Sequence, residues 1–240
     1  MKAMIARARP VNPVIRRLGA LTALDGAAIT ALEEALDRTV TVKVRQELLH
    51  EGQEITRPML MVRGWAALTR CLEDGRRQII SFVLPGDLLG FSSLPRPLAP
   101  STVVALTEAA WCPAPEPESS PSLEMAYAIS RAIDEAHLLG QITRLGRLNA
   151  DERIQDLLLE LMERLETAGL AQDGRYAIPL TQEMLADALG LTPVHVNRML
   201  QQARQAGELS WHSGEVVLHD PKAIRRKVGR LKVRVSRPMI

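Results

Sequence analysis

The sequence predicts an α+β protein in which a β-rich N-terminal half precedes a helical C-terminal half. Three observations lead to this prediction: short β-type runs separated by turn signals up to about residue 112, an uninterrupted helical stretch from Ser120 to about Leu148, and two capped helices joined by a glycine between Thr181 and Leu200. A chain of 240 residues is long enough for two modest domains. We expect four parts: a β-roll over 1–112, a linker and long helix over 113–148, a helix-turn-helix domain with a β-hairpin over 149–220, and a basic tail over 221–240.

The β-rich half begins with a helix over about Ala27 to Ala35. Short runs rich in β-branched and apolar residues follow, and turn signals such as Asp74-Gly75 and Pro85-Gly86 separate them. The predicted strands are Thr39–Val44, Met59–Val62, Trp65–Leu72, Gln78–Leu84 and Thr102–Leu106. Many short strands with regular turns predict a small barrel or roll. The proline-rich stretch 113–121 then links this module to the long helix.

The long helix starts where Ser120 supplies an N-cap and Pro121 occupies the first helical position. Small and apolar residues along it alternate by three and four, which is close to a heptad pattern. These residues are Ala126, Ile129, Ile133, Ala136 and Gly140. Such a stripe can pack on its own domain or on a copy of itself. We expect the second, a two-helix seam in a homodimer, because a helix-turn-helix usually needs two copies to read a palindrome.

A second helix follows at once. Asn149 caps it, and Glu152 three residues later completes a capping box. Its predicted core face consists of Ile154, Leu157, Leu158, Leu161 and Leu165. Gly169 ends the helix, and we expect this helix to seat the C-terminal domain.

The stretch from Leu180 to Leu200 predicts a helix-turn-helix. Thr181 caps the first helix, Gly190 supplies the turn, and Thr192 with Pro193 starts the second helix. Its core face is Val196, Met199, Leu200 and Ala203, and its opposite stripe is Pro193, Val194, Asn197, Arg198 and Gln201. Asparagine can pair bidentately with adenine and arginine with guanine in the major groove. The stripe is therefore a candidate surface for reading DNA.

A β-hairpin is predicted directly after this pair of helices. Gly207 ends the second helix, and Leu209–His212 and Glu215–Leu218 flank a Ser213-Gly214 turn. Such a wing accompanies many helix-turn-helix domains and can touch phosphate. His212 at its tip is a candidate backbone contact, although a lone histidine is more often an ordinary surface residue.

Charge is distributed unevenly along the chain. The net charge is +2 overall, but from Tyr176 to Ile240 ten Lys and Arg oppose five Asp and Glu, a net of +5, which leaves −3 for the remainder. The segment from Pro221 to Ile240 holds eight basic residues and no acidic residue. We expect this tail to add salt-dependent phosphate affinity. A solvated terminus would have the same composition.

Composition excludes several other classes. An aromatic content of 3% argues against base-stacking platforms for single strands, and two cysteines are too few for a disulfide framework or a four-thiolate cluster. No run is long and apolar enough for a signal peptide or a membrane span, so we expect a soluble, cytoplasmic protein. The five histidines show no metal-ligand spacing and no phosphate-binding loop is present. We therefore expect no enzyme activity, no metal and no cofactor.

The order of these parts resembles the cyclic-AMP receptor protein / fumarate-nitrate reductase regulator (Crp/Fnr) family, from about Asn12 to Asp220. The resemblance is strongest over 191–200. It implies a transcription regulator with an N-terminal double-stranded β-roll that senses a signal, a dimerisation helix and a C-terminal winged helix-turn-helix. Its implied partners are a second copy, a double-stranded DNA operator and RNA polymerase. In this alignment Val194, Asn197 and Arg198 take base-reading positions, and Thr181, Thr192, His195 and His212 take phosphate-contacting positions.

The implied sensor site departs from the cyclic-AMP-binding members. The turn Leu84–Gly90 resembles the start of the family's phosphate-binding cassette, but Phe91 replaces the ribose-binding Glu, and Pro100 replaces the phosphate-binding Arg before Ser101. The candidate pocket residues are Gly86, Asp87, Leu88, Gly90, Phe91, Ser101 and Thr102. Without the Arg a cyclic phosphate loses a charge-assisted contact. We expect no cyclic nucleotide binding, unless Arg96 supplies the missing charge.

The effector and one alternative function stay open. The pocket can hold an apolar ligand, answer to a protein signal or have no effector, and a thiol switch at Cys71 or Cys112 is testable. The family's oxygen sensors use an N-terminal cysteine cluster that this chain lacks. The alternative is an effector- or protein-binding adaptor that keeps the helix-turn-helix as a scaffold only. Arg198 on the exposed stripe argues against it.

Overall fold

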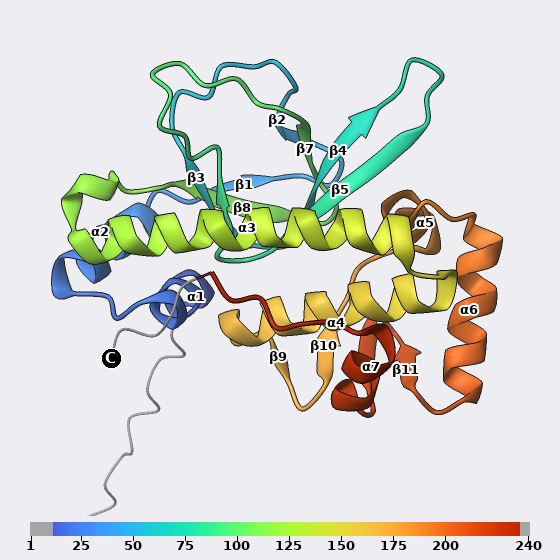
Figure 1. Cartoon of the computed structure of the whole chain (residues 1–240). Helices are drawn as coiled ribbons and strands as arrows, with labels where there is room; N and C mark the ends of the chain where they lie inside the picture. Colours follow the sequence, from blue (N-terminus) through green and yellow to red (C-terminus); the bar gives the residue numbers. More distant parts are fainter. Residues whose placement is uncertain (1–11, 236–240) are drawn as a thin grey trace, which may run out of the picture.

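The computed structural model describes residues 12–235, so residues 1–11 and 236–240, with Arg237 of the predicted tail, lie outside the described part. A long helix, α3 (Pro121–Arg147), crosses the molecule. Figure 1 shows the N-terminal strands on one side of α3 and the C-terminal domain on the other.

Two short helices, α1 (Pro13–Leu21) and α2 (Gly26–Leu36), precede the strands. The sequence predicted α2 but not α1. Asn12 and Asp25 cap them through side-chain oxygens that accept backbone N–H groups. Both helices pack on the start of α3, in a cluster that contains Val14, Leu32 and Tyr127.

The strands form two four-stranded antiparallel sheets, in the orders β1-β8-β3-β6 and β2-β7-β4-β5. The bounds are β1 Val40–Val42, β2 Glu47–Leu49, β3 Met59–Arg63, β4 Ala66–Cys71, β5 Arg77–Val83, β6 Leu88–Leu89, β7 Thr102–Ala105 and β8 Ala109–Pro113. All five predicted strands are present, and the predicted β-roll is confirmed. The sequence missed β2, β6 and β8, which are short or lie at the start of the proline-rich linker. The predicted turn at Asp74-Gly75 joins β4 to β5, with Gly75 at a φ of 85°.

A short 3-10 turn, η1 (Pro117–Ser119), leads into α3, and α4 (Ala150–Ala168) follows. The N-caps of α3 and α4 are those predicted. The Ser120 hydroxyl accepts the Leu123 N–H at 3.3 Å, and Asn149 and Glu152 exchange both bonds of a capping box, at 3.1 and 2.9 Å. The predicted core face of α4 is fully buried.

The orientation of α3 differs from the prediction. Ala126 is completely buried inside its own protomer, so it cannot belong to a seam with a second copy. The inward face of α3 is instead largely polar, and consists of Leu123, Ala126, Tyr127, Ser130, His137, Gln141 and Arg144. Ile129, Ile133, Ala136 and Gly140 are half-buried, and the large apolar side chains exposed on the outer face are Met125, Leu139 and Ile142. The apolar stripe therefore lies about one residue away from the predicted one.

The C-terminal domain contains α5 (Gln182–Leu189), α6 (Pro193–Gln205), β11 (Leu209–His212) and β12 (Glu215–Leu218). The predicted wing is confirmed. Two further strands that the sequence missed, β9 (Ala171–Gln172) and β10 (Arg175–Ala177), extend it to a four-stranded sheet in the order β11-β12-β10-β9. The core of this domain is continuous with that of β5, where Trp65 and Phe82 belong to the same apolar cluster as Leu158 and Leu189.

The predicted basic tail is mostly ordered structure. Residues Pro221–Val228 form helix α7, and Ile224 joins the domain core. Lys227 pairs with Asp151 and Glu208, and Arg225 pairs with Glu163. These residues therefore belong to the folded domain and pair with acids of the same chain, and the phosphate affinity of the segment stays a prediction. Lys222 and Arg226 stay exposed.

Candidate DNA interface and effector cavity

Helix α6 presents one uninterrupted outer face. The Thr192 hydroxyl accepts the His195 N–H at 3.2 Å, which fixes the start of the helix. Val196, Met199, Leu200 and Ala203 are buried, as predicted from their spacing. The opposite side is open to solvent, and the Val194 side chain is 80% exposed.

The predicted contact residues occupy this face to different degrees. Thr192, Pro193, Val194, Arg198 and Gln201 are exposed, whereas His195 and Asn197 are half-buried at its flanks. Gln205, four residues after Gln201, extends the exposed stripe by one turn and was missed, although helical spacing could have found it.

The remaining candidates lie on neighbouring elements. Thr181 is exposed and caps α5 by accepting the Met184 N–H at 3.2 Å. His212 is exposed at the end of β11, beside a Ser213-Gly214 turn in which both φ angles are positive, 51° and 77°. Their contacts with phosphate stay predictions.

The last turn of α5 is held by three other parts of the molecule. The carbonyl oxygen of Ala188 accepts from Gln78 of β5 at 3.2 Å and from Gln141 of α3 at 2.6 Å. Arg153 of α4 donates to Leu189 O at 3.0 Å. An ion pair of 2.6 Å joins Arg77 of β5 to Asp187 of α5. The β4–β5 hairpin is thus in direct contact with the helix-turn-helix.

A cavity of about 170 Å³ lies between the β-roll, α3 and α4. Four of the predicted pocket residues line it: Asp87, Leu88, Gly90 and Ser101. Pro100 also lines it, as does Phe82, whose ring packs edge-on against Trp65 with centroids 6.2 Å apart. The sequence missed Ser81, Asp134, His137 and Arg164, which complete the polar side of the lining.

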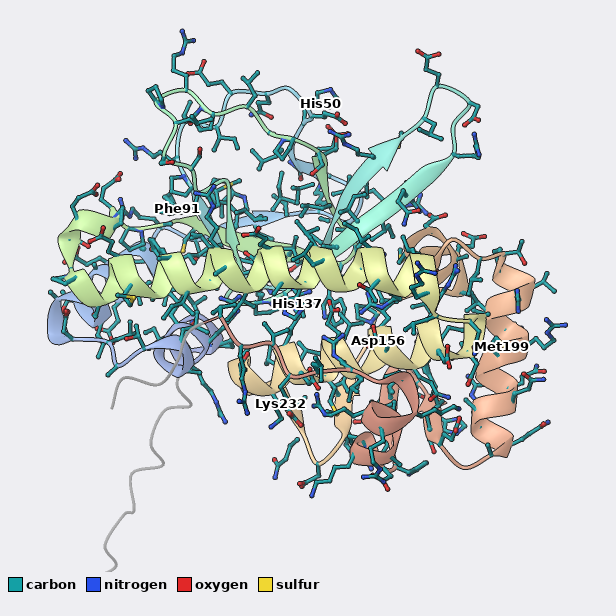
Figure 2. All side chains as sticks on the ribbon, in the orientation of Figure 1. His50, Phe91, His137, Asp156, Met199 and Lys232 are labelled. Carbon is teal, nitrogen blue, oxygen red and sulfur yellow. The ribbon has the colours of Figure 1, made fainter. Side chains whose placement is uncertain are left out.

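Three predicted pocket residues lie elsewhere, which corrects the prediction. Phe91 packs edge-on against Tyr127, with centroids 5.6 Å apart, and Figure 2 shows it near the start of α3. The Thr102 hydroxyl accepts the Glu51 N–H at 3.2 Å. Gly86, at a φ of 93°, is covered by Arg17, whose side chain would lie 2.6 Å from a Cβ at this position.

Two arginines hold the carboxylate of Asp87. Arg164 donates to it at 2.6 Å and to Phe82 O at 2.8 Å. Arg17 pairs with it at 3.2 Å and donates to Gly86 O and to Ser130. This turn of the β-roll is therefore tied to α1, α3 and α4 by charged side chains that are almost entirely buried.

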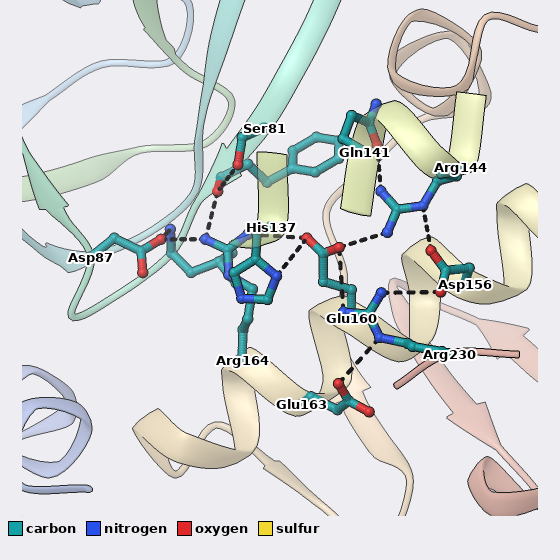
Figure 3. A network of polar contacts seen from close by, with 12 residues as sticks. Ser81, Asp87, His137, Gln141, Arg144, Asp156, Glu160, Glu163, Arg164 and Arg230 are labelled. Carbon is teal, nitrogen blue, oxygen red and sulfur yellow. Dashed lines mark hydrogen bonds and ion pairs between the residues drawn. The ribbon is translucent and has the colours of Figure 1, made fainter. Parts of the chain in front are cut away.

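The ion pairs continue along α4 as one network (Figure 3). Arg144 donates to Asp156 at 2.7 Å and to Glu160 at 2.6 Å, and Arg230 pairs with Asp156 at 3.0 Å. Burial raises the pKa of Glu160, but Arg144 and the neighbouring cationic residues outweigh this and hold it at about 2. Glu160 is therefore an anion throughout the neutral range.

His137 and Asp134 stand at the edge of this network. The Nδ1 atom of His137 is buried without a hydrogen bond and lies 3.8 Å from Glu160. Burial lowers the pKa of His137 to about 4, against the attraction of Glu160. Burial, and then the charge of Asp87, raise the pKa of Asp134 to about 7.

Comparison with known proteins identifies two modules. Residues 39–116 match the cyclic nucleotide-binding domain, and residues 152–227 match the Crp-like helix-turn-helix domain. The nitrogen fixation regulation protein FixK of Bradyrhizobium diazoefficiens is 31% identical over 220 residues, which cover 88% of this chain and 90% of FixK. The chain belongs to the Crp/Fnr family of transcription regulators.

Two further matches agree with this assignment. The transcriptional regulatory protein btr of Bordetella pertussis is 27% identical over 208 residues, covering 82% of this chain and 85% of btr. The structure of FixK2 from Bradyrhizobium japonicum aligns with a TM-score of 0.68 and 26% identity, over 78% of this chain and 95% of FixK2. The chain is accordingly a DNA-binding regulator of the Crp/Fnr type, as the sequence predicted. Within residues 12–235 no helix is long and apolar enough to cross a bilayer.

Two arginines near the sensor site are engaged in ion pairs. Pro100, which the sequence resemblance places at the position of the family's phosphate-binding Arg, lines the cavity. Arg96 forms a bidentate pair with Glu54 on the surface, at 2.9 and 2.7 Å, so it does not supply the missing charge. Arg164 is the one arginine among the lining residues, and Asp87 and Glu160 already pair with it.

Proposed function

We propose that this Crp/Fnr regulator acts as a homodimer that reads a palindromic operator through the outer face of α6. The observation that carries this proposal is the exposed stripe Val194–Arg198–Gln201 on a helix whose opposite face is fully buried. An α-helix of this form enters the major groove with its N-terminal residues on the base edges.

The stripe offers three kinds of base contact. Arg198 can donate two bonds to guanine, and Asn197 can pair with adenine. Val194 is an exposed apolar side chain in the first turn of α6, next to Pro193, which suits contact with a thymine methyl group. Thr181, Thr192, His195 and His212 surround these positions and suit phosphate contacts.

The outer face of α3 supports the dimer. Met125, Leu139 and Ile142 are 48%, 59% and 68% exposed, and Ala128, Ala132 and Ala136 lie among them on the same side of the helix. Apolar residues at this spacing pack well against a second copy of the same helix. Two copies of α6 related by a two-fold axis would contact half-sites about 34–36 Å apart.

Cyclic nucleotide is not the effector in this proposal. The lining of the cavity contains no arginine that is free to bind a phosphate, and Phe91 occupies the sequence position of the ribose-binding Glu. We expect RNA polymerase as a further partner, and the bacterial cytoplasm as the place where the protein binds its operators.

Selection of bound sequences from random duplex DNA tests the proposal. The wild-type protein should enrich a palindrome, and Arg198→Ala should weaken binding to it by about 1–3 kcal/mol and relax the preference at one position of each half-site. Arg57→Ala, at an exposed arginine between β2 and β3, is the matched control and should bind as wild type. Unchanged operator affinity in Arg198→Ala would show that α6 does not read the bases, and would revive the adaptor function.

A further inference from the structure

The size of the cavity limits its ligand. A cavity of about 150 Å³ accommodates a benzene molecule. The cavity beneath the β-roll measures about 170 Å³, so it fits a ligand of about one ring with a short substituent.

The lining has an apolar side and a polar side. Leu49, Ile55, Val103 and Leu138 are among the aliphatic side chains that surround most of the space. The polar side is formed by Ser81, Ser101, Asp134 and His137, with the ion pair of Asp87 and Arg164 next to them. A ligand that fits both sides has a hydrocarbon body and one polar group.

Asp134 differs from the other acids in this region. Asp87, Asp156, Glu160 and Glu163 each pair with at least one arginine. Asp134 has no hydrogen bond and no ion pair with any residue between 12 and 235, although it lines the cavity. A half-buried carboxyl without a partner is costly, and a donor brought by a ligand would relieve that cost.

The surrounding charges determine whether the polar group of the ligand should be positive or negative. The guanidinium of Arg164 is already occupied by Asp87 and Glu160, and His137 is neutral at neutral pH because burial lowers its pKa to about 4. An anionic ligand would find no free cation here and would lie beside Asp134 and Asp87. A protonated amine would pair with the carboxyl of Asp134, which has no partner among residues 12–235.

We propose that the cavity binds a small, largely apolar molecule that carries one protonated amine, with the ammonium group on the Asp134 carboxylate and the hydrocarbon part against the β-roll. Taking this ligand as the effector rests on the proposed function, but binding itself does not require DNA.

Three probes of one shape and different charge test the proposal: benzylamine, benzyl alcohol and benzoate. Calorimetry and thermal unfolding of the full-length protein should show benzylamine binding at least about tenfold more tightly than benzoate. Asp134→Asn removes the charge at constant shape. It should weaken benzylamine binding by about tenfold and leave benzyl alcohol within about twofold.

Two further variants keep the test specific. Glu135→Gln changes the exposed neighbouring acid of α3 and should bind benzylamine as wild type. Ala99→Leu fills the cavity from a buried position in its lining and should weaken benzylamine and benzyl alcohol alike.

The proposal is overturned if benzoate binds as tightly as benzylamine, if Asp134→Asn binds benzylamine unchanged, or if benzylamine does not bind. Operator selection with the same preparations separates the two hypotheses. A protein that enriches a palindrome but ignores benzylamine contradicts the ligand class alone, whereas one that binds benzylamine and no DNA contradicts the proposed function.

Discussion

The side-chain amides of Gln78 and Gln141 donate to the same carbonyl oxygen, that of Ala188, at 3.2 and 2.6 Å. Gln78 belongs to β5 of the sensor and Gln141 to α3, and Ala188 lies in the last turn of α5. Carbonyl groups at the end of a helix have no partner within the helix. Sensor, long helix and helix-turn-helix therefore meet at one atom.

A double-mutant cycle at this atom should be strongly non-additive. In Gln78→Ala or Gln141→Ala the Ala188 carbonyl keeps one donor, whereas the double variant leaves it buried without any. We expect the double variant to lose about 1–2 kcal/mol more than the sum of the two single losses. Urea denaturation of the four proteins measures this difference. Losses that simply add would show that each amide acts independently of the shared acceptor.

Asp134 and His137 should make the free energy of unfolding depend on pH in opposite directions. The Asp134 carboxyl has an ordinary pKa of 3.8 that rises to about 7 in the folded protein, so its stabilising effect is present below pH 3.8 and is lost as the pH rises through 7. The His137 imidazole has an ordinary pKa of 6.5 that falls to about 4, so its effect is present above pH 6.5 and is lost as the pH falls through 4. Between pH 4 and 6.5 the two slopes oppose each other.

Substitution of Asp134 or of His137 should therefore change the slope of the free energy of unfolding against pH in opposite directions. Relative to wild type, Asp134→Asn should gain free energy of unfolding as the pH rises from 4 to 6.5, and His137→Gln should lose it, each with a limiting slope of about 1.4 kcal/mol per pH unit. Urea titrations at several pH values provide the measurement, with Glu135→Gln as the control on the exposed side of α3. Parallel profiles for all four proteins would contradict this assignment.

Arg230 should be essential for stability although it lies close to the C-terminal end. Its side chain is 7% exposed and pairs with Asp156, Glu160 and Glu163 at 3.0, 3.5 and 3.3 Å. Arg230→Ala leaves these carboxylates with too little positive charge, and we expect a loss of about 3–5 kcal/mol. Thermal and urea unfolding of Arg230→Ala and of the control Arg234→Ala, at an exposed arginine, decide the matter. If Arg230→Ala loses as little free energy of unfolding as the control, Arg144 and Arg164 alone are enough to compensate these carboxylates.

The dimer should depend on the outer face of α3. Ile142→Glu places a charge at a side chain that is 68% exposed in the single chain, so it should not disturb the fold but should repel its counterpart in a second copy. Sedimentation should show monomers that no longer bind a palindrome. Leu94→Glu, at a similarly exposed apolar residue of the β-roll, should remain dimeric. An intact Ile142→Glu dimer would move the seam to another surface.

Much of the fold follows from local signals in the sequence. Ser120, Asn149, Thr181 and Thr192 cap the helices at which they were expected, because a cap depends only on neighbours three residues away. Two-residue strands such as β6 carry too few residues for a pattern, and the register of distant chain segments decides their existence.

The inward face of α3 was beyond this kind of prediction. Ser130, Asp134, His137, Gln141 and Arg144 recur at intervals of four and three, a regular stripe that usually marks a solvated face. Here Ser130, His137, Gln141 and Arg144 are buried, and Arg144 pairs with two acids of α4, whereas Asp134 is half-buried beside the cavity. Which acids meet which arginines depends on contacts far apart in the sequence, and the same is true of Arg225 and Arg230 in the predicted tail. The cavity residues on α3 and α4 were missed for this reason.

The edge-on contact between Trp65 and Phe82 gives the protein an optical property. Phe82 lines the cavity, and the Trp65 indole behind it is buried and is one of only three tryptophans in the sequence. A molecule that enters the cavity and displaces the Phe82 ring alters the surroundings of this indole, and with them its fluorescence. Ligand libraries can thus be screened by intrinsic emission, without a dye and without knowledge of the operator.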